Sequence, residues 1–412
     1  MPFRIALSGL NAASSELQVI GNNVSNASTT GFKKSRTEFA DIYAATNLGV
    51  TANAIGSGVK VASVNQQFNQ GNITFTDNNL DLAVSGSGFF RLSDNGVSVY
   101  SRAGAFGVDR TGYVVNSQGQ RLTGYDADSS GNITGALTDL QLSTEDLPPQ
   151  QTSAAELLAN LDSRVDVLDT NNFDEGDPST YHNSTTFTAY DSLGNPRLTT
   201  LYFLRTGDGA WDMYMNVDGT MVDADPLTNT GASNNARSLT FDSAGTLTST
   251  ASLATGNIPG SGGSANFPID LDLSGTSQFG SSFSVNTLTQ DGFSTGRLSG
   301  VDIGETGILT ARYTNGQSST LAQVALANFA NPQGLRQLGD TAWAETYDSG
   351  AALVGAPGTG SLGLVQSGAL EGSNVDLTEQ LVGMITAQRN FQANAQVIST
   401  ADTVTQTVIN IR

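Results

Sequence analysis

Apolar residues near the start of the chain repeat every seven positions. Two series on one side of a helix share this spacing: Phe3, Leu10, Leu17 and Val24, and Ala6, Ala13 and Ile20. Such a repeat is typical of a helix that packs against another helix. A secretory signal would need roughly 7–15 continuous apolar residues, but Ser8 and Gly9 interrupt the first run. The pattern predicts an amphipathic helix within residues 1–30, not a cleaved leader.

The end of the chain carries a second helical pattern, which Ser373 or Asp376 can cap. Its apolar positions are spaced by three, four or seven: Leu377, Leu381, Met384, Phe391, Ala395, Ile398, Ala401, Val404 and Val408. At about 1.5 Å per residue the two helices would be on the order of 35 and 50 Å long, too long for a small β domain to cover. We expect them to pack on each other and on copies of the chain, with packing as core helices of a monomer as the alternative.

These two patterns supply the candidate site residues. Helix packing and polymerisation are assigned to Phe3, Leu10, Leu17, Ile20, Val24, Leu381, Met384, Phe391, Ile398, Val404 and Val408. Asn390 and Gln392 flank Phe391 and are either interhelical hydrogen-bonding residues or part of the wet face.

The long middle of the chain alternates apolar and polar residues, which predicts strands. The clearest alternation is Trp211, Met213, Met215 and Val217. The run 154–162 also alternates and favours a strand, although its composition suits a helix. Asn315 and Gly316 indicate a hairpin turn in which both central residues have positive φ. The expected fold is mainly β, with two or more β domains nested within a discontinuous terminal helical module.

Composition narrows the function classes. The 412 residues carry a net charge of −20, which repels nucleic acid and anionic membrane surfaces, so neither is expected as a partner. No run approaches the roughly 18 apolar residues of a membrane-spanning helix. Cysteine is absent, which excludes disulfides, thiolate metal sites and cysteine nucleophiles. The 46 glycines suit a turn-rich β protein.

Three motifs imitate ligand or catalytic sites. The glycine spacing over residues 358–363 satisfies a pyrophosphate motif, but Pro357 precedes it and no helix pattern follows. Residues 126–137 resemble the start of a calcium loop, yet Leu137 stands where a bidentate acid is needed. The acidic run 173–177 lies near His182, the single histidine. We expect solvated turns at all three, no cofactor, no metal and no enzyme, and we expect Phe89, Phe90 and Phe106 to be core residues.

Three stretches carry a family resemblance: NNVSNASTTGFKKSR, the block that begins GSGFFRLSDNGVSVYSRAG, and LEGSNVDLTEQLVGMITAQRNFQANAQVISTAD. They are similar to the axial proteins of the bacterial flagellum, the rod and hook family. Residues 292–307 and 323–335 look most like the hook-forming members. The resemblance implies a terminal polymerisation module (1–30 and 371–412), a connecting segment (31–70 and 355–370), an inner β domain (71–147 and 290–354) and an inserted outer β domain (148–289).

The resemblance also implies a function. The subunit would be exported by the flagellar type III apparatus without a cleaved signal peptide and added beneath a hook cap. It would polymerise outside the cell into a curved hollow tube, a universal joint that transmits torque between rod and filament and meets the rod and the hook–filament junction proteins. The alternatives are a distal rod protein, or an extracellular β-rich adhesin or glycan-active enzyme. Because isolated helices are marginal in water, we expect the termini to be disordered before assembly.

Overall fold

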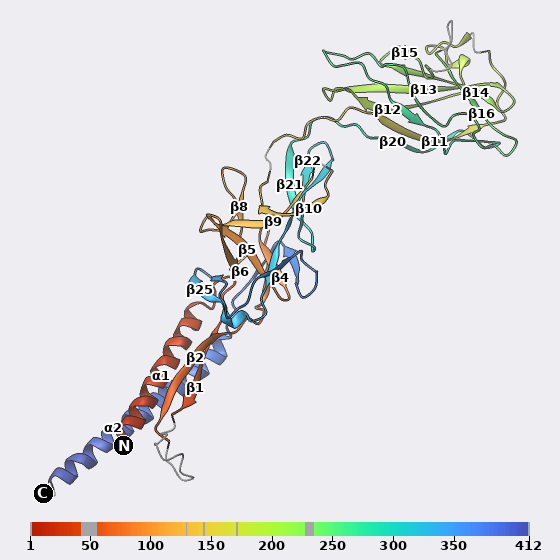
Figure 1. Ribbon diagram of the computed structural model, residues 1–412. Helices are drawn as coiled ribbons and strands as arrows, with labels where there is room; N and C mark the ends of the chain where they lie inside the picture. Colours follow the sequence, from red (N-terminus) through yellow and green to blue (C-terminus); the bar gives the residue numbers. More distant parts are fainter. Residues whose placement is uncertain are drawn as a thin grey trace. The chain divides into compact units, whose positions relative to one another are not determined.

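The computed structural model describes residues 2–42, 56–128, 130–142, 145–169, 172–226 and 235–410 (Figure 1). The chain forms two compact units. The terminal unit comprises Met1–Thr144, Gly300–Arg312 and Ser318–Arg412, and the inserted unit comprises Glu145–Ser299 and Tyr313–Gln317. The mainly β architecture with helical ends agrees with the prediction. None of the helices in the described ranges combines the length and apolar character needed to cross a membrane.

Two helices and a hairpin form one part of the terminal unit. Helix α1 (Pro2–Ser25) and helix α2 (Leu377–Asn410) lie side by side (Figure 1). Strands β1 (Ser35–Asp41) and β2 (Val59–Gln66) pair antiparallel and pack against α1. The Asp376 carboxylate accepts the backbone N–H groups of Thr378 (2.8 Å) and Glu379 (3.2 Å), so it caps α2 as predicted. Both terminal segments are helical here, because each covers part of the other.

The rest of the terminal unit is β structure. Its larger sheet has the order β21-β22-β23-β9-β5-β6-β26-β25, with β7, β8, β10, β24 and β27 paired off this path, while β4 pairs with β28 and β3 with β29. The early strands are β3 (Ile73–Phe75), β4 (Leu82–Ser85), β5 (Phe89–Asp94), β6 (Val97–Ser101), β7 (Gly107–Val108), β8 (Val114–Val115), β9 (Arg121–Ala127) and β10 (Ile133–Asp139). The late strands are β21 (Leu298–Ile303), β22 (Ile308–Tyr313), β23 (Ser318–Val324), β24 (Leu326–Asn328), β25 (Arg336–Gly339), β26 (Ala342–Ala344), β27 (Leu353–Gly355), β28 (Leu364–Ser367) and β29 (Ala369–Glu371).

Aromatic residues form much of the core of this β structure. Phe90 packs edge-on against Phe106 with ring centroids 5.4 Å apart, and both are buried. Phe89 lies in a second cluster, 5.7 Å from Trp343. The assignment of these three phenylalanines to the core is confirmed.

The inserted unit consists of two sheets that share one core. Strand β11 (Ala154–Asp162) pairs with β18, β19 and β20, and β14 (Ala210–Val217) lies in the second sheet, of order β12-β13-β14-β15 with β16 on β14. Leu157 of β11 and Trp211 of β14 are buried in the same cluster. The strand over 154–162 and the alternation on β14 are therefore confirmed. The other strands are β12 (Asn183–Tyr190), β13 (Pro196–Gly207), β15 (Thr220–Val222), β16 (Arg237–Thr240), β17 (Ser252–Ala254), β18 (Asp270–Asp272), β19 (Ser277–Phe279) and β20 (Ser284–Gln290).

The hairpin between β22 and β23 differs in detail from the prediction. The turn lies at Asn315 and Gly316, but among these two residues only Gly316 has positive φ (+81°). The N–H of Gly316 donates to the carbonyl of Tyr313 (3.1 Å). The loop is longer than two residues, so Gly316 at the last turn position supplies the left-handed geometry and Asn315 has no positive φ.

Candidate assembly interface

Small residues allow α1 and α2 to approach closely. A Cβ atom at Gly9 of α1 would lie 2.5 Å from the Asn394 side chain of α2. Farther along, a Cβ at Gly383 of α2 would lie 3.4 Å from the Ile20 side chain of α1. Ala387 of α2 is fully buried. Each helix thus contributes a glycine to the contact, and the helices are antiparallel because Gly9 meets Asn394 while Ile20 meets Gly383.

A buried amide fixes the position of these helices. Asn23 of α1 is 1% exposed, and its Nδ2 donates to Gln380 Oε1 of α2 (3.0 Å) and to the Ser35 carbonyl of β1 (2.8 Å). Its Oδ1 accepts the Ser35 N–H (2.9 Å). Both donors and the acceptor of this side chain are used, so the buried polar group is stabilising. One residue thus sets α1 against both α2 and the hairpin.

A buried ion cluster connects the two ends of the chain to the β structure. Lys33 Nζ lies 2.6 Å from Glu371 Oε1, and Arg102 Nη1 lies 3.0 Å from Glu371 Oε2. Lys33 also donates to the Asn69 carbonyl (2.8 Å), and Glu371 accepts the Gly71 N–H (2.8 Å). Burial lowers the pKa of Lys33, and the attraction of Glu371 opposes that effect. We call Lys33, Glu371 and Arg102 the clasp.

Large apolar side chains remain exposed on both helices. This exposed apolar face comprises Phe3, Ile5 and Leu7 of α1 and Leu377, Leu381, Val382, Ile385, Val397, Val404 and Ile409 of α2. Helix α2 runs past the start of α1 (Figure 1), and Val404 near its end is 57% exposed among the residues that the structure describes. A monomeric protein rarely exposes so many large apolar residues in one region, and such patches mark contact surfaces.

Comparisons with known proteins identify the family. Four family models match: a flagella basal body rod protein model (residues 3–33), a flagellar hook protein FlgE/F/G D1 domain (83–145), a flagellar basal body protein FlaE D2 domain (160–293) and a flagellar basal body rod FlgEFG protein C-terminal model (366–411). The flagellar hook protein FlgE of Escherichia coli is 39% identical over 419 residues, with both chains covered completely. The chain belongs to the flagellar hook protein family. It is a structural protein of the flagellar hook, and the family is not a known enzyme family.

Further relatives agree with this assignment. The flagellar hook protein FlgE of Salmonella typhimurium is 39% identical, and the match covers 100% of both chains. The flagellar hook protein FlgE of Treponema pallidum is 34% identical, and the match covers 98% of both chains. A crystal structure of the Helicobacter pylori flagellar hook protein FlgE2 covers 72% of this chain and 100% of its own with a TM-score of 0.53. At 14% identity that likeness supports the fold alone.

The structure distributes the residues of the predicted stripes over different environments. Ile20 is buried; Leu10, Leu17, Val24, Met384, Phe391 and Ile398 are half-buried; Phe3, Leu381 and Val404 are exposed. The side chain of Val408 lies outside the described residues. Asn390 and Gln392 are exposed, so the hydrogen bond between the helices comes instead from Asn23 and Gln380. In this hook-family chain the stripes are not one continuous seam.

Sequence reasoning missed Asn23, Gln380 and the clasp. A lysine in the turn after α1 and a glutamate 338 positions later give no periodic signal, because the contact is made by the tertiary fold. No rule of local spacing would have paired Lys33 with Glu371.

The motifs that imitated other sites have structural roles. His182 accepts the Arg205 N–H through Nδ1 (3.1 Å) and packs on Trp211, and burial lowers its pKa. Asp177 caps a short 3-10 helix at Pro178–Thr180. The Asp128 carboxylate accepts the N–H groups of Ser130 and Asn132 in the turn before β10. Residues 358–363 connect β27 to β28, both strands, so a helix N-terminus for a pyrophosphate is missing at this described position.

Proposed function

We propose that copies of this chain polymerise through the exposed apolar face into a curved hollow tube that links rod to filament. The tube acts as a universal joint, transmitting torque while it bends. The observation that carries the proposal is the set of large apolar side chains left uncovered on both terminal helices, with Val404 57% and Leu381 51% exposed. Burying them between copies stabilises the contact by roughly 25 cal/mol per Å² of apolar surface.

The asymmetry of the surface supports an open polymer. The exposed apolar face lies on the helices. A head-to-tail contact joins two different surfaces of the same chain, so a neighbouring copy would cover this face with another part of its surface. A contact of that kind that does not close into a ring continues as a helical filament. Polar contacts elsewhere between copies exchange at low cost because water can replace them, which permits bending while the apolar contacts hold.

The further partners of this proposal rest on the family. We propose contacts with the rod, the hook cap and the hook–filament junction proteins, an extracellular location, and delivery by the flagellar type III export apparatus. The acidic surplus keeps unassembled copies soluble at high concentration, because like charges repel at long range.

Electron microscopy of the purified protein tests the proposal. Concentrated protein should form tubes with a central channel, and the amount of tube should rise steeply above a threshold concentration because nucleation is unfavourable. A variant with Leu381→Ser, Val397→Ser and Val404→Ser should remain soluble and unassembled, whereas serine at the exposed polar positions Thr400, Thr403 and Thr407 should leave assembly intact. If the parent chain stays monomeric at every concentration, the proposed function is wrong.

A further inference from the structure

The sequence contains two Asn-Gly pairs, Asn95-Gly96 and Asn315-Gly316. An asparagine that precedes a glycine can lose its side-chain amide without an enzyme. The backbone nitrogen of the glycine attacks the side-chain carbonyl carbon of the asparagine, a C–N bond forms, and ammonia leaves. Glycine favours this step because it has no side chain to hinder its nitrogen. The two pairs have the same local chemistry, so their surroundings decide which one reacts in the folded chain.

Asn95 and Gly96 form the whole loop between β5 and β6. Asp94 pairs with Val97 across the turn, and the two loop residues have φ values of +50° and +90°. Both are exposed, and a Cβ at Gly96 would meet nothing within 4 Å. Asn95 Nδ2 donates to Asp94 Oδ1 (2.9 Å) on the surface, and the Gly96 N–H makes no hydrogen bond within the described part of the chain. A hairpin tip with so few contacts opens locally at little cost.

The side chain of Asn315 is held in place. Its Nδ2 donates to the Ser294 carbonyl (2.7 Å), and its Oδ1 accepts the Gln317 N–H (3.1 Å). The N–H of Gly316 donates to the Tyr313 carbonyl (3.1 Å). Ring closure at Asn315 therefore requires these hydrogen bonds to break before the glycine nitrogen can reach the side-chain carbonyl carbon.

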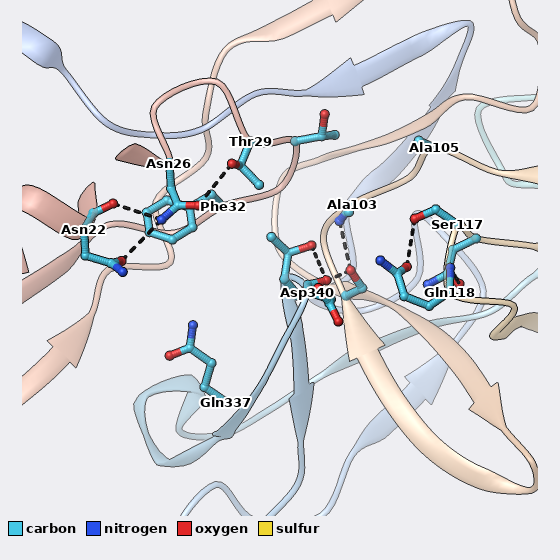
Figure 2. A pocket seen from close by; sticks show the side chains of 14 residues that line it. Asn22, Asn26, Thr29, Phe32, Ala103, Ala105, Ser117, Gln118, Gln337 and Asp340 are labelled. Carbon is cyan, nitrogen blue, oxygen red and sulfur yellow. Dashed lines mark hydrogen bonds between the residues drawn. The ribbon is translucent and has the colours of Figure 1, made fainter. Parts of the chain in front are cut away.

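A third asparagine, Asn116, precedes the small residue Ser117 and is fixed in a similar way. Its Oδ1 accepts the N–H groups of Gln118 (3.1 Å) and Gln120 (2.9 Å), and its Nδ2 donates to Gln120 Oε1 (2.9 Å). Ser117 and Gln118 line a pocket of about 450 Å³ (Figure 2), where the Ser117 hydroxyl donates to Gln118 Oε1 (3.0 Å). Asn116 thus provides a second protected asparagine for comparison.

We propose that Asn95 is a site of spontaneous deamidation in the folded protein. The Gly96 nitrogen bonds to Asn95 Cγ, and its proton leaves with the amide as ammonia. Water then opens the five-membered imide, which gives aspartate or isoaspartate at position 95. The proposal concerns the single chain and does not depend on polymerisation.

Both products change the turn. Each replaces the Asn95 Nδ2 donor with a second carboxylate beside Asp94, so an attraction becomes a repulsion. Isoaspartate also adds a methylene group to the main chain. A two-residue loop needs a defined turn to match the twist of its strands, so this product no longer fits between β5 and β6.

Mass spectrometry of the full chain tests the proposal. Folded protein is kept in warm, mildly alkaline buffer, and a second sample is kept in the same buffer with urea. Tryptic peptides 92–102, 111–121 and 313–336 separate Asn95, Asn116 and Asn315, and fragment ions assign each gain of one mass unit. In the folded protein Asn95 should react at least about tenfold faster than Asn315, since the hydrogen bonds of Asn315 raise its barrier. In urea Asn95 and Asn315 should react at similar rates.

Gly296→Ala is the matched variant. Its Cβ would lie 2.7 Å from the Asn315 side chain and displace it, so Asn315 should react faster in the folded variant while Asn95 is unchanged. Equal rates for Asn95 and Asn315 in the folded parent chain would overturn the proposal, as would a reaction of Asn95 that occurs only in urea. Unchanged protection of Asn315 in the folded variant would overturn the argument that its contacts set the difference.

Discussion

Lys33 and Glu371 form an ion pair of 2.6 Å between side chains that are both fully buried, although 338 positions separate them in the sequence. Arg102 adds a second cation at 3.0 Å. The clasp joins the turn after α1, the strand before α2 and the β structure. Separating these segments would leave buried charges without their partners, which is strongly destabilising. The clasp therefore holds both terminal segments in place.

Glu371→Gln should destabilise the terminal unit by about 3–5 kcal/mol, because Lys33 and Arg102 lose their shared anion. Glu379→Gln is the matched control: Glu379 pairs with Lys34 at 2.8 Å but is 61% exposed, so its loss should cost less than about 1 kcal/mol. Urea unfolding followed by the fluorescence of Trp343 in a Trp211→Phe background reports on the terminal unit alone. Equal costs for the two variants would contradict the role of the clasp.

Gly9→Ala should weaken the pairing of α1 with α2, because its Cβ would meet the Asn394 side chain at 2.5 Å. Gly21→Ala on the same helix meets nothing within 4 Å and should be neutral or stabilising by up to about 1 kcal/mol. Thermal unfolding followed by circular dichroism compares them. Asn394→Ala in the Gly9→Ala background should restore the loss, and failure of that rescue would show that the contact is not the cause.

Ile398→Asp should abolish tube formation while the β domains stay folded. Ile398 is half-buried on α2, and an unpaired charge on a buried surface costs several kcal/mol. Gln396→Asp introduces the same charge at an exposed position of the same helix and should assemble normally. Sedimentation and electron microscopy measure assembly, and near-ultraviolet circular dichroism checks the β domains. Normal tubes from Ile398→Asp would exclude this part of α2 from the interface.

The Asp162 carboxyl should titrate with a pKa of about 2, since hydrogen bonds from Arg164 hold it below its usual 3.8. A lowered acid pKa stabilises the folded inserted unit above pH 3.8, and this contribution is lost as the pH falls through 2. Carbon-detected nuclear magnetic resonance of the carboxyl carbon measures the pKa. Arg164→Ala should return it toward 3.8, while Arg312→Ala, which removes a different ion pair, should leave it unchanged.

Limited proteolysis of dilute monomer should remove both terminal helices first and leave a resistant body of roughly residues 70 to 360. The reason is that α2 exposes Leu381 and Val404 and has only part of one face covered by α1. Assembly into tubes should protect the same cleavage sites. Termini that resist protease in dilute monomer would show that the helical pair is stable alone, and the expected disorder before assembly would be wrong.

The sequence by itself determined the elements. The seven-residue repeat through Ala13 and Ile20 predicted a packed helix, and the alternation through Trp211 predicted a strand, since the periods of helix and strand are local properties of the chain. The candidate interface was predictable only as a set of apolar residues. Which of them would be covered depends on how α1 and α2 align, and Gly9 opposite Asn394 settles that alignment.

Only the tertiary structure decided the clasp and the Asn23 amide network. Each joins segments that are remote in sequence: Lys33 with Glu371, and Asn23 with Gln380. A buried charge or amide is tolerated only where its partners arrive from elsewhere in the fold, and periodicity carries no information about those partners. Local pattern therefore specified the helices and strands, and long-range packing specified how polar groups connect them.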